Sequence, residues 1–260
     1  MSRFIAMTLI ALLSQPLFAF QDTDAKAWID KVVARVGGMD GLHRLKDVQY
    51  TYIYQLPNGK QDVSIERYIF DGEASWAEYT KGDATMPETK GKVVQGYDGK
   101  TAWATIDGQL SSDEKVVKRA DFLRKTNYYW FAMMHKLGDP GLQYKSKGTK
   151  TLEGIPYQLV EVGFENGVGD VQDTYLLYIN PFTHLVDQFL FTVMDFDRKE
   201  PLLMRVDYET FEGVTLPTMR RYIPSNWEAE PQGDGWVLEV MQDITFNNGF
   251  KKTDFSKGGG

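Results

Sequence analysis

The sequence contains no cysteine and only three histidines in 260 residues. Without cysteine there are no disulfide bonds, thiolate metal sites, cysteine nucleophile or site for bacterial lipidation. The histidines, His43, His135 and His184, lack the spacing by which ligands converge on a metal, so we expect neither a metal site nor a cofactor. We expect His184 in a solvated turn. His135 is expected at the end of a helix, where a charged imidazole interacts favourably with the helix dipole.

Recognisable catalytic motifs are also absent. The sequence has no G-x-S-x-G nucleophile elbow, no phosphate-binding glycine loop and no dinucleotide fingerprint. Carboxylates are abundant, and a hydrolase that uses two of them leaves no spacing signature. The crowded residues Asp195, Asp197, Asp207 and Glu209 are better interpreted as a solvated polar face. We therefore assign no catalytic residue and expect a protein that is not an enzyme.

Basic residues are outnumbered, with 29 lysines and arginines against 36 acidic residues and a net charge of −7. Binding to a phosphate backbone requires a basic surface. We therefore do not expect nucleic acid to be a partner.

Beyond the first nineteen residues there is no long apolar run. That segment carries one charge, Arg3, followed by an apolar run from Phe4 to Leu13, then Pro16 and the small Ala19. This layout is typical of a cleaved signal peptide, and the run is short for a membrane span. We expect a signal peptide at 1–19, a single periplasmic domain at 20–257 and a flexible tail at 258–260. A retained membrane anchor is the alternative interpretation.

Two regions have helical patterns. Apolar residues at 25, 28, 29, 32, 33 and 36 predict a one-sided amphipathic helix that ends at Gly37 and Gly38. A second region, from Ser111 to Pro140, predicts a helical pair with a bend at 125–127, where the patterning is weak.

Most of the sequence from Asp47 onward alternates between β-patterned runs and glycine turns, as at Asn58-Gly59 and Asp98-Gly99. Spacings of about ten to twenty residues are typical of an antiparallel meander. Residues 174–196 form the clearest hairpin, with a turn at Asn180-Pro181. We predict an α+β fold: a strongly curved antiparallel sheet of about ten or eleven strands, an incomplete β-barrel, with the N-terminal helix and the inserted pair covering its open face. A flat sheet on helices fits the same patterning.

Four consecutive aromatic residues, at 128–131, stand in the inserted helical region. On a helix they point in directions about 100° apart, so no single stripe buries all of them. Methionines beside aromatics form an adaptable apolar surface suited to variable acyl chains, although filling of an ordinary core is the alternative. We predict as ligand-lining or lid residues Tyr128, Trp130, Phe131, Met133, Met134, Trp76, Trp103 and Tyr52.

Residues 175–183 read YLLYINPFT, which resembles the strand and turn of LolA-like periplasmic proteins. The helix that ends at Gly37-Gly38, the strands with Trp76 and Trp103, and the inserted helices follow the same order of parts. Residues 130–141, WFAMMHKLGDPG, resemble most closely a poorly characterised subgroup. The resemblance implies an incomplete barrel closed by helices that handles lipoprotein acyl chains or other lipids. No lipoprotein-contacting residue of the carrier carries over to this sequence.

Our leading hypothesis is a periplasmic binding or carrier protein for a lipid, a lipoprotein acyl chain or another apolar ligand, held in the concave face of the sheet. We expect a monomer that touches the membrane peripherally or transiently. One alternative is an envelope enzyme or a carbohydrate-binding module, because tyrosines at 50, 52 and 54 are suited to stacking on sugars. Another is an assembly factor that contacts envelope proteins.

Overall fold

A computed structural model describes residues 22–165, 167 and 172–257. The signal peptide and the tail expected from the sequence lie outside these residues. The described part forms thirteen strands, three α-helices and two 3-10 helices. No helix within it is both long and apolar enough to cross a membrane.

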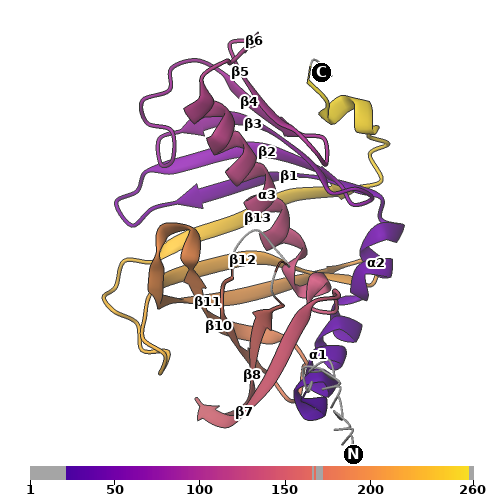
Figure 1. Cartoon of the computed structure of the whole chain (residues 1–260), viewed down its shortest axis with the longest axis vertical. Coiled ribbons are helices and arrows are strands. Elements are labelled where there is room, and N and C mark those ends of the chain that lie inside the picture. Colours follow the sequence, from indigo (N-terminus) through magenta and orange to yellow (C-terminus); the bar gives the residue numbers. More distant parts are fainter. Residues whose placement is uncertain (1–21, 166, 168–171, 258–260) are drawn as a thin grey trace, which may run out of the picture.

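The strands form one antiparallel sheet in the order β6-β5-β4-β3-β2-β1-β13-β12-β11-β10-β9-β8-β7 (Figure 1). Two meanders are therefore joined through β13, and β6 and β7 are the open edges. The bounds are β1 Asp47–Gln55, β2 Gln61–Ile69, β3 Ala74–Gly82, β4 Val93–Tyr97, β5 Ala102–Ile106, β6 Gln109–Leu110, β7 Leu142–Leu152, β8 Ile155–Phe164, β9 Tyr175–Ile179, β10 Val186–Val193, β11 Arg198–Phe211, β12 Val214–Pro224 and β13 Val237–Phe246.

The predicted hairpin at 174–196 is confirmed as β9 and β10, which pair from Ile179 with Val186 to Tyr175 with Phe191. Its turn is closed by the Asn180 side chain, whose Oδ1 accepts hydrogen bonds from the backbone N–H groups of Phe182 (3.0 Å) and Thr183 (3.3 Å). The LolA-like motif in this turn thus has a structural role.

The N-terminal helix is also confirmed, as α1 Thr23–Val36, which buries Ala25, Ile29, Val32 and Val36. Gly37 ends it in the left-handed conformation, with φ 99°. A side chain there would meet the carbonyl oxygen of Gly213 at 3.1 Å, so glycine suits both the turn and the close approach. A second short helix, α2 Gly38–Arg44, follows directly.

The inserted region is one helix, α3 Glu114–Lys136, rather than the expected pair. The patterning is weak near residues 125–127 because a core position is occupied by a charged residue, Arg124, which is fully buried. The strand count is thirteen rather than ten or eleven, partly because the short β6 has only two residues. The 3-10 helices are η1 Met194–Phe196 and η2 Lys252–Phe255.

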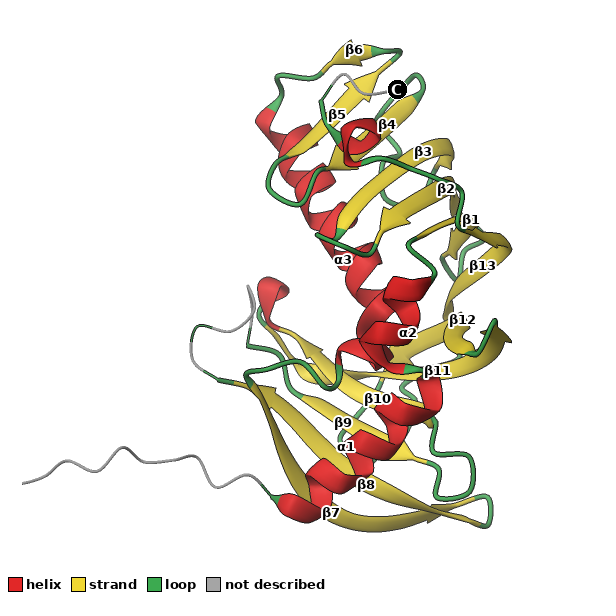
Figure 2. Ribbon diagram, turned by 90° about the vertical axis from the view of Figure 1, so that its right-hand side faces the viewer, coloured by secondary structure: helices red, strands yellow, loops and turns green. Residues whose placement is uncertain are grey.

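Helix α3 connects β6 to β7, the two opposite edges of the sheet. A flat sheet of thirteen strands would be about 58 Å wide. The 23 residues of α3 span only about 35 Å. The sheet therefore curves around the helix, which lies along its inner side (Figure 2). The predicted α+β fold with a strongly curved, unclosed antiparallel sheet is confirmed.

Candidate functional site

The concave face of the sheet under α3 is the candidate site. We call residues 128–136 of α3 the aromatic half and residues 114–127 the polar half. The aromatic half faces strands of both meanders, whereas the polar half lies over β3, β4 and β5.

Phe131 is the centre of the packing between the aromatic half and the first meander. It is fully buried and stacks against Tyr50 and Phe70, with centroids 5.8 Å apart in each case. Tyr68 meets Phe131 and Tyr128 edge-on at 5.3 Å. Offset and edge-on contacts are the favoured aromatic geometries, so this part of the helix is well-packed core.

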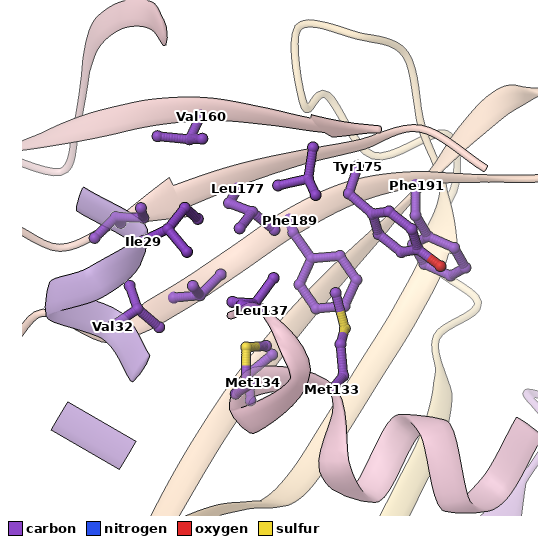
Figure 3. Close-up of a cluster of buried hydrophobic side chains, with 14 of the residues drawn as sticks. Ile29, Val32, Met133, Met134, Leu137, Val160, Tyr175, Leu177, Phe189 and Phe191 are labelled. Atoms are coloured by element: carbon purple, nitrogen blue, oxygen red, sulfur yellow. The ribbon is translucent and has the colours of Figure 1, made fainter. Parts of the chain in front are cut away.

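The two methionines of the aromatic half pack against the second meander. Met133 and Met134 are 2% and 1% exposed and pack in an apolar cluster with α1 and strands β7 to β11 (Figure 3). Trp130, which is half-buried, lies against Phe189 (6.0 Å) and Phe191 (5.1 Å) of the same cluster. The structure thus brings together five of the predicted lining residues on α3.

Tyr52 joins Phe131 and Tyr128 in one buried cluster, but Trp76 and Trp103 do not. Ala77, next to Trp76 on β3, packs in a cluster with Leu123 of α3. Because side chains alternate along a strand, Trp76 lies on the convex face.

Trp103 also belongs to the convex face, where its Nε1–H donates to the Phe255 carbonyl oxygen at 2.8 Å. Both tryptophans contribute to a cluster with η2. These two residues therefore lie across the sheet from α3, and the sequence alone did not distinguish the two faces.

The polar half of α3 is held by a buried ion pair. The Arg124 guanidinium contacts the Glu66 carboxylate of β2, through Nη1 and, at 3.0 Å, through Nη2, and both side chains are 0% exposed. Arg124 also donates to the Tyr79 hydroxyl (3.0 Å) and to Gln95 Oε1 (3.3 Å). A buried pair of this kind requires every donor and acceptor to be satisfied.

Burial and neighbouring charges shift the pKa values of Arg124 and Tyr79. Burial acts to lower the pKa of Arg124, but the charge and hydrogen bond of Glu66, together with the Tyr79 and Tyr68 hydroxyls, outweigh that effect and raise the pKa above its ordinary value. For Tyr79, burial is the main reason that the pKa rises to about 12. Both groups therefore keep their protons at neutral pH, as the observed donors require.

A second buried ion pair supports the middle of α3. Arg220 of β12 donates from Nε to Glu239 of β13 at 2.8 Å, and from Nη1 to the backbone carbonyl oxygen of Trp130 at 2.8 Å. The sheet thus holds the helix backbone itself, in the first turn of the aromatic half.

His135 differs from its expected role. It is 1% exposed, and its Nε2 lies 3.2 Å from the carbonyl oxygen of Val36. Burial lowers the pKa of His135 to about 4, so the ring is neutral and Nε2–H donates. A neutral ring has no favourable charge interaction with the helix dipole, because the charged form is excluded by burial.

Sequence reasoning missed Glu66, Arg124, Arg220 and Glu239. Charged residues are rarely buried, so a charged residue in a sequence is normally predicted to lie at the surface. One signal was available: Glu66 shares its face of β2 with Tyr68, a residue type that is often buried. No comparable signal marks Arg124, because its partner is 58 positions away.

Two hollows lie outside the contact between α3 and the sheet. One, of about 270 Å³, is lined by His43, Lys46, Asp47, Ile69, Asp71, Asn247, Gly249 and Phe250. The other, of about 430 Å³, is lined by Glu209, Phe211, Met241, Gln242, Asp243 and Ile244. Neither of these two hollows is lined by α3. The buried side chains of the aromatic half pack against the concave face in this conformation. Among the described residues, no group of three histidine or carboxylate side chains is placed to hold a metal ion.

A family model described as a family of unknown function, DUF6503, matches residues 3–199 of the chain. None of the curated proteins compared with the sequence matches it.

Similar solved structures cover almost the whole molecule. A DUF1329 family protein from Desulfovibrio piger has a TM-score of 0.56 and 14% identity, over 90% of this chain and 98% of that one. A putative outer membrane lipoprotein-sorting protein domain from Vibrio parahaemolyticus has a TM-score of 0.53 and 10% identity, over 91% and 97%. A LolA superfamily protein from Nitrosomonas europaea has a TM-score of 0.53 and 12% identity, over 90% and 98%. The LolA-like resemblance is therefore confirmed for the fold.

Proposed function

This chain belongs to the DUF6503 family of unknown function, and we propose that it is a non-enzymatic binding or carrier protein of the cell envelope. Its ligand would be a lipid, a lipoprotein acyl chain or another apolar molecule, held between α3 and the concave face. One observation carries the proposal: the apolar inner face of β8 to β11 is covered by a helix that is not part of the sheet.

The similar folds support this choice. One solved structure is described as a putative outer membrane lipoprotein-sorting domain and another as a LolA superfamily protein. The tyrosines that suggested sugar stacking are 2% exposed at Tyr50 and 7% at Tyr52. They lie under α3 rather than in an open row, so a carbohydrate platform is the weaker candidate.

Ligand entry requires displacement of α3, because its side chains fill the face. Residues 138–141, between α3 and β7, include two glycines and are the proposed hinge. Residues 111–113 tie the other end of α3 to β6, so the polar half moves together with this two-residue edge strand. Each methylene of a ligand that replaces water contributes about 0.8 kcal/mol, less the costs of ordering and of the helix contacts that are lost.

The remaining features of the proposal come from the sequence. They are export by a signal peptide at 1–19, a single periplasmic domain at 20–257, a monomeric state, contacts with envelope proteins and only transient contact with a membrane. We propose Tyr128, Trp130, Phe131, Met133, Met134 and Tyr52 as the residues closest to the ligand.

Mass spectrometry of organic extracts tests the proposal, using protein purified from its native envelope. We expect a lipid that co-purifies reproducibly, and saturable binding of a fluorescent fatty-acid probe by the extracted protein. Absence of both would overturn the proposal.

Variants separate binding from stability. Trp130→Ala should weaken probe binding more than it lowers the free energy of unfolding, because Trp130 is half-buried at the edge of the apolar cluster. Met134→Ala, at a fully buried site, should mainly destabilise, by about 2–5 kcal/mol. Trp227→Ala is the matched control, since Trp227 is 40% exposed, lies in the connection between β12 and β13 and belongs to neither cluster under α3. Equal effects of the Trp130 and Trp227 changes on binding would contradict the assigned site.

A further inference from the structure

The buried ion pair between Glu66 and Arg124, under the polar half of α3, indicates the chemical class of the ligand. Glu66 is fixed in the sheet, whereas Arg124 belongs to the helix that must move. We propose that the ligand is an amphiphile with a primary ammonium head, which binds Glu66 in the place that the Arg124 guanidinium occupies in this structure. This inference rests on the proposed function, because it assigns a polar end to the apolar ligand site.

The donors to Glu66 are divided between sheet and helix. Ser64 Oγ (2.8 Å) and the Tyr68 hydroxyl (3.1 Å) are on the same strand as Glu66. Arg124, and Asn127 Nδ2 at 3.3 Å, are on α3. Displacement of the helix therefore removes the positive charge and leaves the carboxylate with neutral donors alone. When a ligand covers this face in place of α3, the carboxylate is buried again and favours a new cation, because an unpaired buried charge is costly.

The acceptors that remain match an ammonium group. In this structure the guanidinium donates to Glu66, to the Tyr79 hydroxyl and to Gln95 Oε1, all three of which are on the sheet. A primary ammonium has three donors and no acceptor. The Tyr79 ring, 5.9 Å from the guanidinium carbon, adds an aromatic face, and such faces attract cations.

The polar site is continuous with the apolar one. Tyr68, which donates to Glu66, contacts Phe131 at 5.3 Å, and Phe131 belongs to the aromatic half. A head at Glu66 therefore directs an attached chain toward Phe131. The polar half of α3 presents little apolar surface to the sheet, since its only buried residues are Ala120 and Arg124. The tail is thus expected under the aromatic half.

Probes with the same tail and different heads test the inference. Binding of dodecylammonium, dodecyl sulfate and dodecyl maltoside to the full chain is measured by calorimetry below their micelle concentrations. We expect dodecylammonium to bind about tenfold or more tightly than the other two, since a charge-assisted contact is worth about that ratio. Arg124→Gln should strengthen dodecylammonium binding further, because the internal competitor is removed.

Glu66→Gln should abolish the preference for the ammonium head while binding of the dodecyl tail persists. This change leaves Arg124 buried without a partner. The same test is therefore repeated with the double variant Glu66→Gln with Arg124→Gln, which has no unpaired charge. Near-ultraviolet circular dichroism verifies that each variant is folded. Glu228→Gln, at an exposed position, is the control for general attraction of cations to an acidic protein.

The outcomes distinguish the two proposals. Equal affinities for all three heads, or an ammonium preference that survives in the folded Glu66 variants, would overturn the head-group inference and leave the carrier function standing. If no probe binds the wild type or the Arg124 variant, the carrier function itself fails.

Discussion

Residues 114–127 and residues 128–136 of α3 lie on the same sheet, but they bury different kinds of side chain. The polar half buries only Ala120 and Arg124, and its main contact is one directional ion pair. The aromatic half buries six residues, and all of them except His135 lie in two apolar clusters. Apolar packing is non-directional and tolerates exchange of one apolar group for another, whereas a buried ion pair accepts only a partner of matching charge and geometry. One helix thus combines an adaptable contact with a selective one.

The largest effect is expected in the aromatic half. Phe131→Ala should lower the free energy of unfolding by about 4 kcal/mol, because it leaves a cavity between Tyr50 and Phe70. Phe122→Ala, on the polar half where the ring is 37% exposed, should cost about 1 kcal/mol or less. Urea denaturation measures both. Similar losses for the two variants would remove the contrast between the halves.

A smaller loss is expected when the ion pair is broken. Arg124→Met should cost about 3 kcal/mol, because Glu66 is then buried without its cation. The double variant Arg124→Met with Glu66→Gln should recover much of that loss, since no unpaired charge remains. A double variant that is as unstable as the sum of the two single variants would show that the pair is not coupled.

Acid titration tests the state of His135 in the aromatic half. The folded protein resists protonation until about pH 4, whereas the unfolded chain binds the proton near pH 6.5. The free energy of unfolding should therefore fall as the pH falls through this window, by up to about 3 kcal/mol from this group. His135→Gln keeps a donor for the Val36 carbonyl and should lack the part of the pH dependence that comes from the imidazole. The measurement is denaturation of the wild type and the variant at a series of pH values. Parallel pH curves would mean that His135 is not buried in its neutral form.

The smallest effect concerns a contact at the outer side of the polar half. Phe122 meets Phe196 of η1 edge-on at 5.8 Å, but Phe196 is 70% exposed. Phe196→Ala should change the free energy of unfolding by about 1 kcal/mol or less, because little area is buried. Hydrogen exchange should quicken locally, at the Asp197 amide that bonds Met194. Faster exchange throughout α3 would instead indicate that this contact holds the whole polar half.

The accuracy of the sequence predictions differs between elements for physical reasons. Helix α1 was predictable because its burial follows a one-sided repeat that is complete within 14 residues. Helix α3 was predicted as two helices because Arg124 interrupts the apolar repeat without interrupting the backbone hydrogen bonds. Trp76 and Trp103 were assigned to the site, but both faces of β3 and β5 carry buried residues, so alternation does not show which face meets the helix.

The sequence alone determined the local elements and the class of fold, because hydrophobic periodicity and turn residues act over a few positions. It also identified residues 128–134 as a segment buried on several sides. Only the tertiary structure decided that this segment fills the concave face, and that the polar half is fastened by Arg124 to Glu66. Those facts depend on residues 58 positions apart being brought together when one helix joins the two edges of a curved sheet.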